Sequence, residues 1–479
     1  MRSKPLILFL FLASASYAAS SPPVDCTHLL AWSTGGESTA RLIRIVQQRG
    51  LAVDPKAQSD LRNAGVAPEL LAELAKTKNL SSSSCPADLL KATALAHSKK
   101  YDEAAERVNA RLEKDPHNGS LHFLLAYLKQ QQGDWDGAFD EYVDSKEAEP
   151  DFAEVHNRLA LVFYQGDDGD NAIGEARTAL SMDFDDAEAY RMLALGHYAN
   201  QQYAAAMNAF QESLTRDPNN ADVYYEMGIV ARDQKLEEQA SQDFRKSIAL
   251  NPKLWQAHGS LGVLLGGQNR FAEGIAELKL ARQLAPNEPS IQDDLAGVYY
   301  AKGDYDIAIA EFAELFRKYP NWHRGHDSLA RAYMAKNEYS SAIAELKLAV
   351  EQNPSSAAEH RALGQLLLLA DQQPDAKREL QIAVELDPDS AASHYYLGTA
   401  LLELHQLPPA LKEFQEAVRI EPSAEHHYGL AACLINAGRD NEALAEIETA
   451  TRLDPNKALY RARKEELMQL MRTNSGLAH

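Results

Sequence analysis

The sequence predicts an all-α fold, an α-solenoid superhelix of repeated two-helix units that follows a small helical module. Three observations support this prediction: prolines recur at a fixed interval, apolar residues between them follow helical spacing, and 45% of the 479 residues are hydrophobic. The prolines are 34 residues or twice 34 apart, at Pro116, Pro150, Pro218, Pro252, Pro286, Pro320, Pro354, Pro388 and Pro422. Because proline lacks an N–H and disfavours helical geometry before it, each one marks the end of a unit.

The first 18 residues resemble a secretion signal. Arg2 gives a positive start, an apolar run at 6–13 follows, and residues 16–18 (Ser-Tyr-Ala) fit the small-x-small pattern of a cleavage site. The apolar run is shorter than the roughly 18 residues that span a bilayer. We therefore expect a signal peptide at 1–18, a linker at 19–25, and an exported bacterial protein, periplasmic or extracellular, with no membrane span.

Three cysteines remain after export, and two of them bracket one small segment. Disulfides persist in the compartments that exported proteins reach. We hypothesise a disulfide between Cys26 and Cys85, with two free thiols as the alternative. Cys433 replaces a small residue within a helix, so we expect a buried free thiol there.

Residues 26–84 do not follow the 34-residue period and are predicted to form a small helical module. Gly50 ends one helix, Asp54-Pro55 begins a second, and Pro68 begins a third. A serine-rich stretch then joins the module to the repeats. The module begins with Trp32-x-x-Gly35-Gly36, a pattern too short to indicate a family.

Residues 187–220 illustrate one repeated unit. Tyr190 and Leu193 lie on the packing face of a first helix, and Ala206 and Phe210 lie on that of a second. In neighbouring units the first helix carries a small residue, such as Gly228, which lets the two helices approach closely.

The order of a large residue, Leu, Gly or Ala, an aromatic residue, Ala, Phe, Ala and Pro over 34 positions resembles the tetratricopeptide-repeat family. Eleven units match this order, beginning near residues 85, 119, 153, 187, 221, 255, 289, 323, 357, 391 and 424. The repeat array therefore spans 85–457. Residues 458–479 place Leu459, Leu467 and Leu470 on one helical stripe, which predicts a terminal capping helix and tail.

The resemblance implies a concave groove, lined by the first helices, that binds other proteins or peptides. Tyrosine and arginine favour recognition because they combine large contact area with hydrogen-bonding tips. The residues at the inward-facing positions, which form the candidate partner-binding groove, are Tyr164, Arg191, Tyr198, Tyr225, Arg232, Tyr300, Arg331, Arg361, Tyr395 and Tyr428. Acidic residues beside them, including Glu154, Glu188, Asp222 and Asp233, make the groove mixed in charge.

Histidine recurs at the fourth position of seven units, at His122, His156, His258, His326, His360, His394 and His427. A metal site is one interpretation, and a helix-packing position that needs a large flat side chain is the other. One histidine per unit places the rings along a line, and no cysteine or carboxylate pattern completes the four ligands of zinc. We therefore favour packing and expect no metal.

The sequence indicates no catalytic residues and no cofactor. It contains no glycine-rich phosphate loop, no H-E-x-x-H and no G-x-S-x-G motif. The net charge of −21 disfavours nucleic acid, because phosphate binding needs a concentrated basic face.

These features predict a non-enzymatic protein-interaction scaffold in envelope assembly or secretion. One alternative is a scaffold or glycan-binding subunit of an exopolysaccharide export machine. Another is that residues 26–84 are the functional head and the repeats serve as a spacer.

Overall fold

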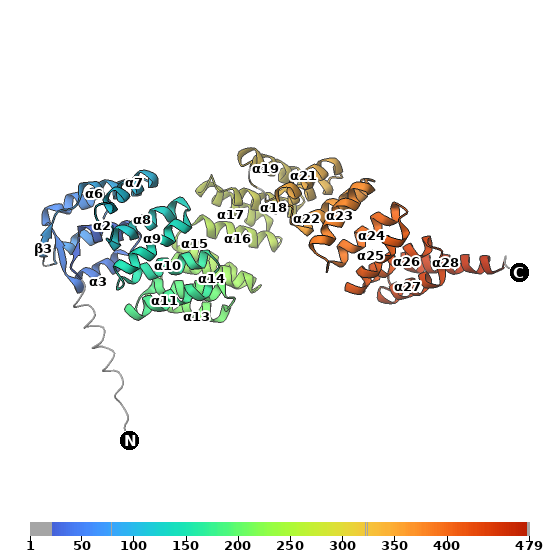
Figure 1. The fold of residues 1–479 in the computed structure, drawn as a ribbon, viewed down its shortest axis with the longest axis horizontal. Helices are drawn as coiled ribbons and strands as arrows, with labels where there is room; N and C mark the ends of the chain where they lie inside the picture. Colours follow the sequence, from blue (N-terminus) through green and yellow to red (C-terminus); the bar gives the residue numbers. More distant parts are fainter. Residues whose placement is uncertain (1–21, 78, 321, 323, 477–479) are drawn as a thin grey trace, which may run out of the picture. The chain divides into compact units, whose positions relative to one another are not determined.

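The computed structural model describes residues 22–476, except 78, 321 and 323. The predicted signal peptide at 1–18 lies outside the described residues. The chain divides into two compact units, Met1–Pro252 and Lys253–His479 (Figure 1). Helices dominate both units, so the all-α repeat fold is confirmed.

The N-terminal module forms the beginning of the first unit. Its elements are β1 (Val24–Asp25), α2 (Cys26–Thr34), α3 (Thr39–Arg49), β2 (Leu51–Val53), the 3₁₀ helix η1 (Pro55–Ala57), α4 (Gln58–Asn63), α5 (Pro68–Leu74) and β3 (Asn79–Ser83). Asp25 caps α2 by accepting a hydrogen bond from the His28 N–H at 3.0 Å. Gly50 follows α3 with φ of 83°, a left-handed conformation that glycine adopts without strain.

Besides its helices, the module contains a parallel sheet in the order β1-β2-β3, which the sequence did not indicate. Val24 pairs with Leu51, and Leu51 pairs with Asn79. The strands have two, three and five residues, so none is long enough for the alternating pattern by which a strand is predicted. Two of them lie in segments that sequence reasoning assigned to the linker and to a serine-rich connection.

Five helix pairs complete the first unit. They are α6 (Ala87–His97) with α7 (Tyr101–Leu112), α8 (Gly119–Gln132) with α9 (Trp135–Ala148), α10 (Ala153–Gln165) with α11 (Gly169–Met182), α12 (Ala187–Ala199) with α13 (Tyr203–Arg216), and α14 (Ala221–Asp233) with α15 (Glu237–Leu250). Each pair corresponds to one predicted repeat. The aromatic residues expected to fill the space between helices, such as Phe210 and Phe244, are fully buried. At Gly228 an added Cβ would lie 2.5 Å from the Phe244 ring, so this position tolerates only glycine without rearrangement.

The second unit contains six further pairs and a terminal helix. The pairs are α16 (Trp255–Gly267) with α17 (Phe271–Leu284), α18 (Pro289–Lys302) with α19 (Tyr305–Lys318), α20 (His326–Ala335) with α21 (Tyr339–Gln352), α22 (Ala357–Leu369) with α23 (Gln373–Leu386), α24 (Ala391–Glu403) with α25 (Leu407–Ile420), and α26 (Ala424–Asn436) with α27 (Asp440–Leu453). The terminal helix is α28 (Ala458–Gly476).

The short segment between the two helices of every pair contains one residue with a left-handed backbone. Their φ angles lie between 54° and 91°, and the residues are Lys99, Gly133, Asp167, Gln201, Lys235, Asn269, Gly303, Asn337, Asp371, His405 and Gly438. After this residue the chain bonds back to the first helix; for example, the Gln202 N–H donates to the His197 carbonyl at 2.8 Å. The short turn holds the paired helices antiparallel.

Helix α28 packs on the last repeat, and its buried face includes Leu467 of the predicted stripe but not Leu459 or Leu470. Tyr460 and Leu467 are buried, whereas Leu459 and Leu470 are about half exposed, at 52% and 48%. Lys464 forms an ion pair with Glu448 of α27 at 2.9 Å.

Candidate binding groove

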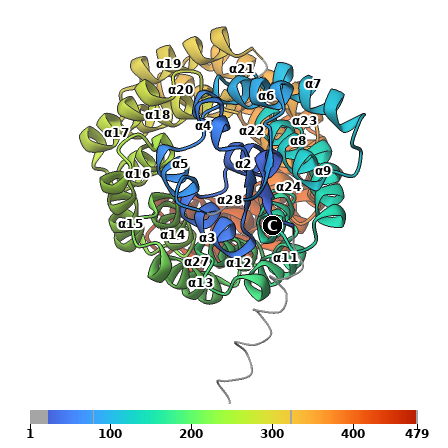
Figure 2. The same ribbon diagram turned by 90° about the vertical axis from the view of Figure 1, so that its left-hand side faces the viewer.

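The N-terminal module is seated against the first helices of the first repeats. We call the helices α6, α8, α10, α12 and α14 the first-helix row. Helix α2 packs against α6 and α8, and Figure 2 shows it on the inner side of the row, while α9, α11 and α13 lie outside. Trp32 is fully buried, and its ring stacks on Phe152 with centroids 4.4 Å apart. The concave side of these repeats is therefore occupied by the protein itself.

Two glycines allow this close seating. A Cβ at Gly35 would lie 2.3 Å from the Phe123 ring, and one at Gly36 would lie 2.7 Å from the Arg158 guanidinium. The Trp32-x-x-Gly35-Gly36 pattern thus serves the contact between the module and α8 and α10.

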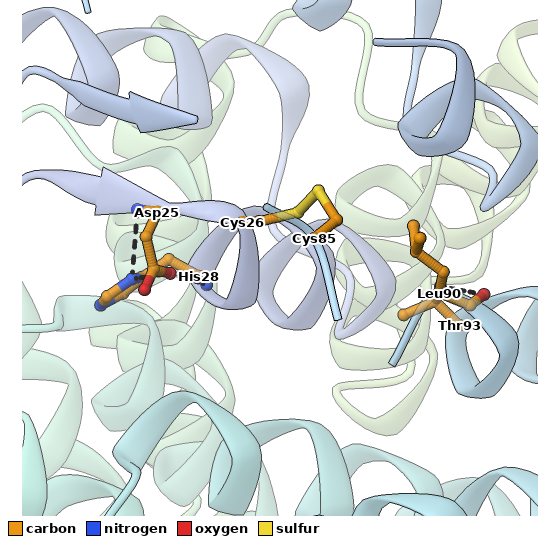
Figure 3. The surroundings of a disulfide bond; sticks show 6 residues. All are labelled: Asp25, Cys26, His28, Cys85, Leu90 and Thr93. Atoms are coloured by element: carbon orange, nitrogen blue, oxygen red, sulfur yellow. Dashed lines mark hydrogen bonds and ion pairs between the residues drawn. A yellow bond between two sulfur atoms is a disulfide. The ribbon is translucent and has the colours of Figure 1, made fainter. Parts of the chain in front are cut away.

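A disulfide also ties the module to the repeats. Cys26 at the start of α2 bonds to Cys85, two residues before α6, with the Cα atoms 5.2 Å apart (Figure 3). Cys433 is a buried free cysteine.

A buried group of charges anchors α3 to the row. Arg41 donates a hydrogen bond to Asp186, the N-cap of α12, and lies 3.6 Å from the Glu37 carboxylate. Glu154 of α10 is also buried and pairs with Arg158 at 2.8 Å. Burial, reinforced by the charge of Glu154, raises the pKa of Glu37 well above its usual value, although Arg41 opposes the shift.

Two further arginines of α3 reach the loops that precede the first helices. Arg44 lies 3.5 Å from Asp183, and Arg49 lies 3.6 Å from Asp151. Acidic positions of the repeats thus face basic positions of the module.

The groove residues predicted in the first unit interact with other residues of the repeats. Arg191 is half-buried and paired with Glu188 at 2.8 Å and with both carboxylate oxygens of Glu226. Tyr225 packs on Phe244 with ring centroids 6.0 Å apart, so it also contributes to the core. Arg232 is exposed and pairs with Asp233 at 2.9 Å.

Tyr164 and Tyr198, from neighbouring repeats, line one pocket of about 530 Å³. The other lining residues are Gln165, Asp167, Ala199, Gln201, Tyr203 and Asp233. The Tyr198 hydroxyl donates a hydrogen bond to Asp233. Burial is the larger cause, and this hydrogen bond the second, of the raised pKa of Tyr198. Tyr203 and Asp167 were not predicted. Both residues lie at the turn between paired helices. The prediction used only the inward-facing positions of the first helices, so it did not include them.

The five predicted residues of the second unit contact different neighbours. Tyr300 packs near Tyr305 at 5.6 Å, and Arg331 pairs with Asp327 at 3.0 Å. Arg361 donates to the Ser390 hydroxyl at 3.2 Å.

The last two of these tyrosines pack on other aromatic rings. Tyr395 lies 5.7 Å from Phe414, and burial raises the pKa of Tyr395 to about 12. Tyr428 packs 5.0 Å from Tyr460 of α28, so the terminal helix covers part of its ring.

The recurrent histidines join the two helices of their own repeat. The Nδ1–H of each donates a hydrogen bond to the carboxylate of a glutamate 19 residues later, at 2.5–2.8 Å. The glutamates are Glu141, Glu175, Glu277, Glu345, Glu379, Glu413 and Glu446. The constant offset of 19 residues is visible in the sequence, but it joins two different helices, so the periodicity of one helix does not indicate it.

One of these pairs has a third acidic neighbour. Ligand atoms of His122, Glu141 and Asp144 lie within 4.8 Å of one another. Glu141 also forms an ion pair with Lys129 at 2.8 Å. His122 Nε2 forms a hydrogen bond with the Pro116 carbonyl at 3.0 Å. Both His122 and Glu141 therefore already have protein partners.

The geometry defines an α-helical repeat protein in which the N-terminal module packs against the beginning of the first-helix row. Models described as tetratricopeptide repeat match residues 89–151, 187–220, 221–254, 294–357, 361–425 and 397–458, which together span more than half of the chain. The chain belongs to the tetratricopeptide-repeat family.

Solved structures with similar repeats include the yeast Tom70, at 16% identity over 81% of this chain and 95% of that one, with a TM-score of 0.40. The APC/C hetero-tetramer Cut9–Hcn1 matches at 13% identity over 96% and 98%, with a TM-score of 0.41. YrrB, "a TPR protein with an unusual peptide-binding site", matches at 18% over 39% and 97%, with a TM-score of 0.36. These low scores carry no argument about function. No curated protein matched the chain.

Among the described helices, none combines the length and the apolar character needed to cross a membrane.

Proposed function

We propose that this protein is a non-catalytic scaffold that binds a polypeptide partner on the first-helix row, beyond its own N-terminal module. The supporting observation is that this row already holds a polypeptide. The module buries Trp32 against Phe152 and Arg41 against Asp186, so the face accommodates both aromatic and basic side chains. Repeat arrays present extended concave surfaces that suit such binding.

The part of the row that the module leaves free has the composition of a recognition surface. Arg191 is held by carboxylates on two helices, so its guanidinium is already ordered. Tyr198 is likewise oriented by its bond to Asp233. Ordered aromatic and arginine side chains lose little entropy when a partner binds, which favours affinity.

We also propose that the protein is exported and acts in envelope assembly or secretion. The Cys26–Cys85 disulfide supports export, because such bonds persist in oxidising compartments. N-terminal sequencing of the native protein should begin at Ala19, and fractionation should place it outside the cytosol. A native protein that retains Met1 and stays in the cytosol contradicts export.

Site-specific photocrosslinking tests the binding face. A photoreactive residue at Arg232, which is exposed on α14, should capture a polypeptide partner in native cells. The matched control is the same residue at Gln211, which is exposed on the second helix α13. Capture should occur at Arg232 and fall to background at Gln211, and it should be lost on Tyr198→Ala.

Two outcomes contradict the proposal. Equal capture from both positions indicates non-specific contact, and absence of capture from Arg232 removes the first-helix row as the binding face. If binding persists after deletion of residues 85–457, the N-terminal module is the functional head instead.

A further inference from the structure

We infer that the pocket between Tyr164 and Tyr198 is a socket for one basic side chain, arginine or lysine, of the polypeptide partner. This inference rests on the proposed function and specifies the partner's chemistry. The pocket lies where α10, α12 and α14 end, so three neighbouring repeats contribute to it. We call it the tyrosine socket, defined by Tyr164, Asp167, Tyr198, Tyr203 and Asp233.

The lining of the tyrosine socket has negative charge and aromatic rings but no cation. Two carboxylates, three phenol rings and two amides line it, with no lysine, arginine or histidine. Arg232 offsets only the charge of Asp233, to which it is paired at 2.9 Å. Asp167 has no ion-pair partner among the described residues, so one carboxylate remains uncompensated.

The rings favour a side chain that is both cationic and partly apolar. Tyr198 and Tyr203 lie with centroids 6.3 Å apart, tilted by 46°, and Tyr164 comes from the preceding repeat. A guanidinium or ammonium group near such ring faces gains cation–π attraction, and its aliphatic stem can cover the rings. The volume of about 530 Å³ leaves room for one such chain with water.

The ends of three helices add to this preference. Helix C-termini carry partial negative charge and favour cations within the last turn. Gln165, Ala199 and Asp233 are the last residues of α10, α12 and α14, and all three line the socket.

The protein's own module shows the same pairing elsewhere on the row. Three arginines of α3, Arg41, Arg44 and Arg49, face Asp186, Asp183 and Asp151. This is charge complementarity between a basic helix and an acidic repeat edge, built into one chain. A basic partner residue in the tyrosine socket extends that pattern to the free part of the row.

The second unit provides a natural comparison, three repeats further along the sequence. Tyr300 and Tyr305 occupy the positions of Tyr198 and Tyr203. There, however, Gly266 replaces Tyr164 and Ala335 replaces Asp233. Lys302 and Lys336 form ion pairs at 2.6 Å with Asp304 and Asp306, the two residues that flank Tyr305 in the sequence. This site lacks the third ring and already carries cations, so it should not bind another.

Saturation-transfer NMR with defined probes tests the inference on the full chain. The probes are acetyl-Gly-X-Gly-amide peptides in which X is arginine, lysine, citrulline or glutamate. Arginine and lysine peptides should bind saturably, and citrulline, which keeps the shape of arginine without its charge, should bind about tenfold more weakly. The glutamate peptide should show no saturable binding.

Conservative variants locate the binding. Asp167→Asn preserves the left-handed turn, which asparagine tolerates, and combined with Asp233→Asn it should weaken arginine-peptide binding about tenfold. Tyr198→Ala should abolish saturable binding, whereas the matched control Tyr300→Ala should not change it. Unchanged circular dichroism melting confirms that each variant is folded.

Three outcomes overturn the inference: citrulline binding as tightly as arginine, no effect of the two aspartate substitutions, or equal losses from Tyr198→Ala and Tyr300→Ala. These outcomes differ from failure of the proposed function. If photocapture at Arg232 persists while the basic peptides fail to bind, the scaffold stands and the tyrosine socket is refuted.

Discussion

Removing the Cys26–Cys85 disulfide should loosen the N-terminal module without displacing it from the repeats. The two cysteines are 59 residues apart in the sequence, and the closed loop contains every element of the module except β1. In the chain-entropy account, a bond closing a loop of this length stabilises by about 4 kcal/mol, between the values for 15-residue and 100-residue loops. The contacts of Trp32 and Arg41 with the repeats remain in the folded state, so the module should keep its position. The lost stabilisation should instead lower the free energy needed to open the module.

Hydrogen exchange measured by mass spectrometry reports this opening locally. In the Cys26→Ala/Cys85→Ala variant, amides of β2 and α5 should exchange about a thousandfold faster, since each 1.4 kcal/mol is a factor of ten. Reductant added to the wild-type protein should reproduce the change. Amides of α24, in the other unit, should keep their rates, as should the whole chain in Cys433→Ala.

Two results would refute this reasoning. An acceleration below tenfold in β2 and α5 means that packing against the first-helix row, and not the covalent loop, holds the module closed. An equal acceleration in α24 means that the substitutions act on the whole molecule.

Three further predictions concern the repeats. Asp243 has its pKa raised to about 6 by burial, so the stability it contributes is present below pH 4 and lost as pH rises through 6; Asp243→Asn should flatten this part of the pH profile of urea unfolding. The hydrogen bond to Glu141 raises the pKa of His122, so stability should fall as pH rises above 6.5; His122→Gln, which copies Gln292 at the same repeat position, should remove that slope. If the pH dependence of stability persists after the substitution, it must come from another titrating group. Gly228→Ala should destabilise by about 1–3 kcal/mol in thermal unfolding because of Phe244, whereas Gly297→Ala, which meets nothing within 4 Å, should not destabilise; equal losses would contradict the packing argument.

Local features of the chain were sufficient to predict the repeats. Each pair of helices has its own packing residues and turn within 34 positions, and every pair except the one at 153–186 also has a terminal proline, so the information is short-range and repeated. The burial of Phe210 and Phe244 and the constraint at Gly228 agree with that prediction. Inward-facing positions could also be assigned, because helix geometry fixes which side each residue takes.

The candidate site was less accessible from the sequence. Tyr164 and Tyr198 were predicted separately, but the turn residues Asp167 and Tyr203 were not, because their position depends on the left-handed residue between paired helices. The histidine–glutamate pairs were missed for a different reason. Their 19-residue offset joins two helices, and periodicity within one helix does not reveal it.

The sequence alone determined the repeat class, the number of units and the faces of their helices, since these depend on contacts between residues close together in the chain. Only the tertiary structure decided where the N-terminal module sits. Arg41 meets Asp186 across 145 residues, and Trp32 meets Phe152 across 120. Such contacts depend on the curvature accumulated over several repeats, to which each repeat contributes only a small rotation, so no local pattern encodes them.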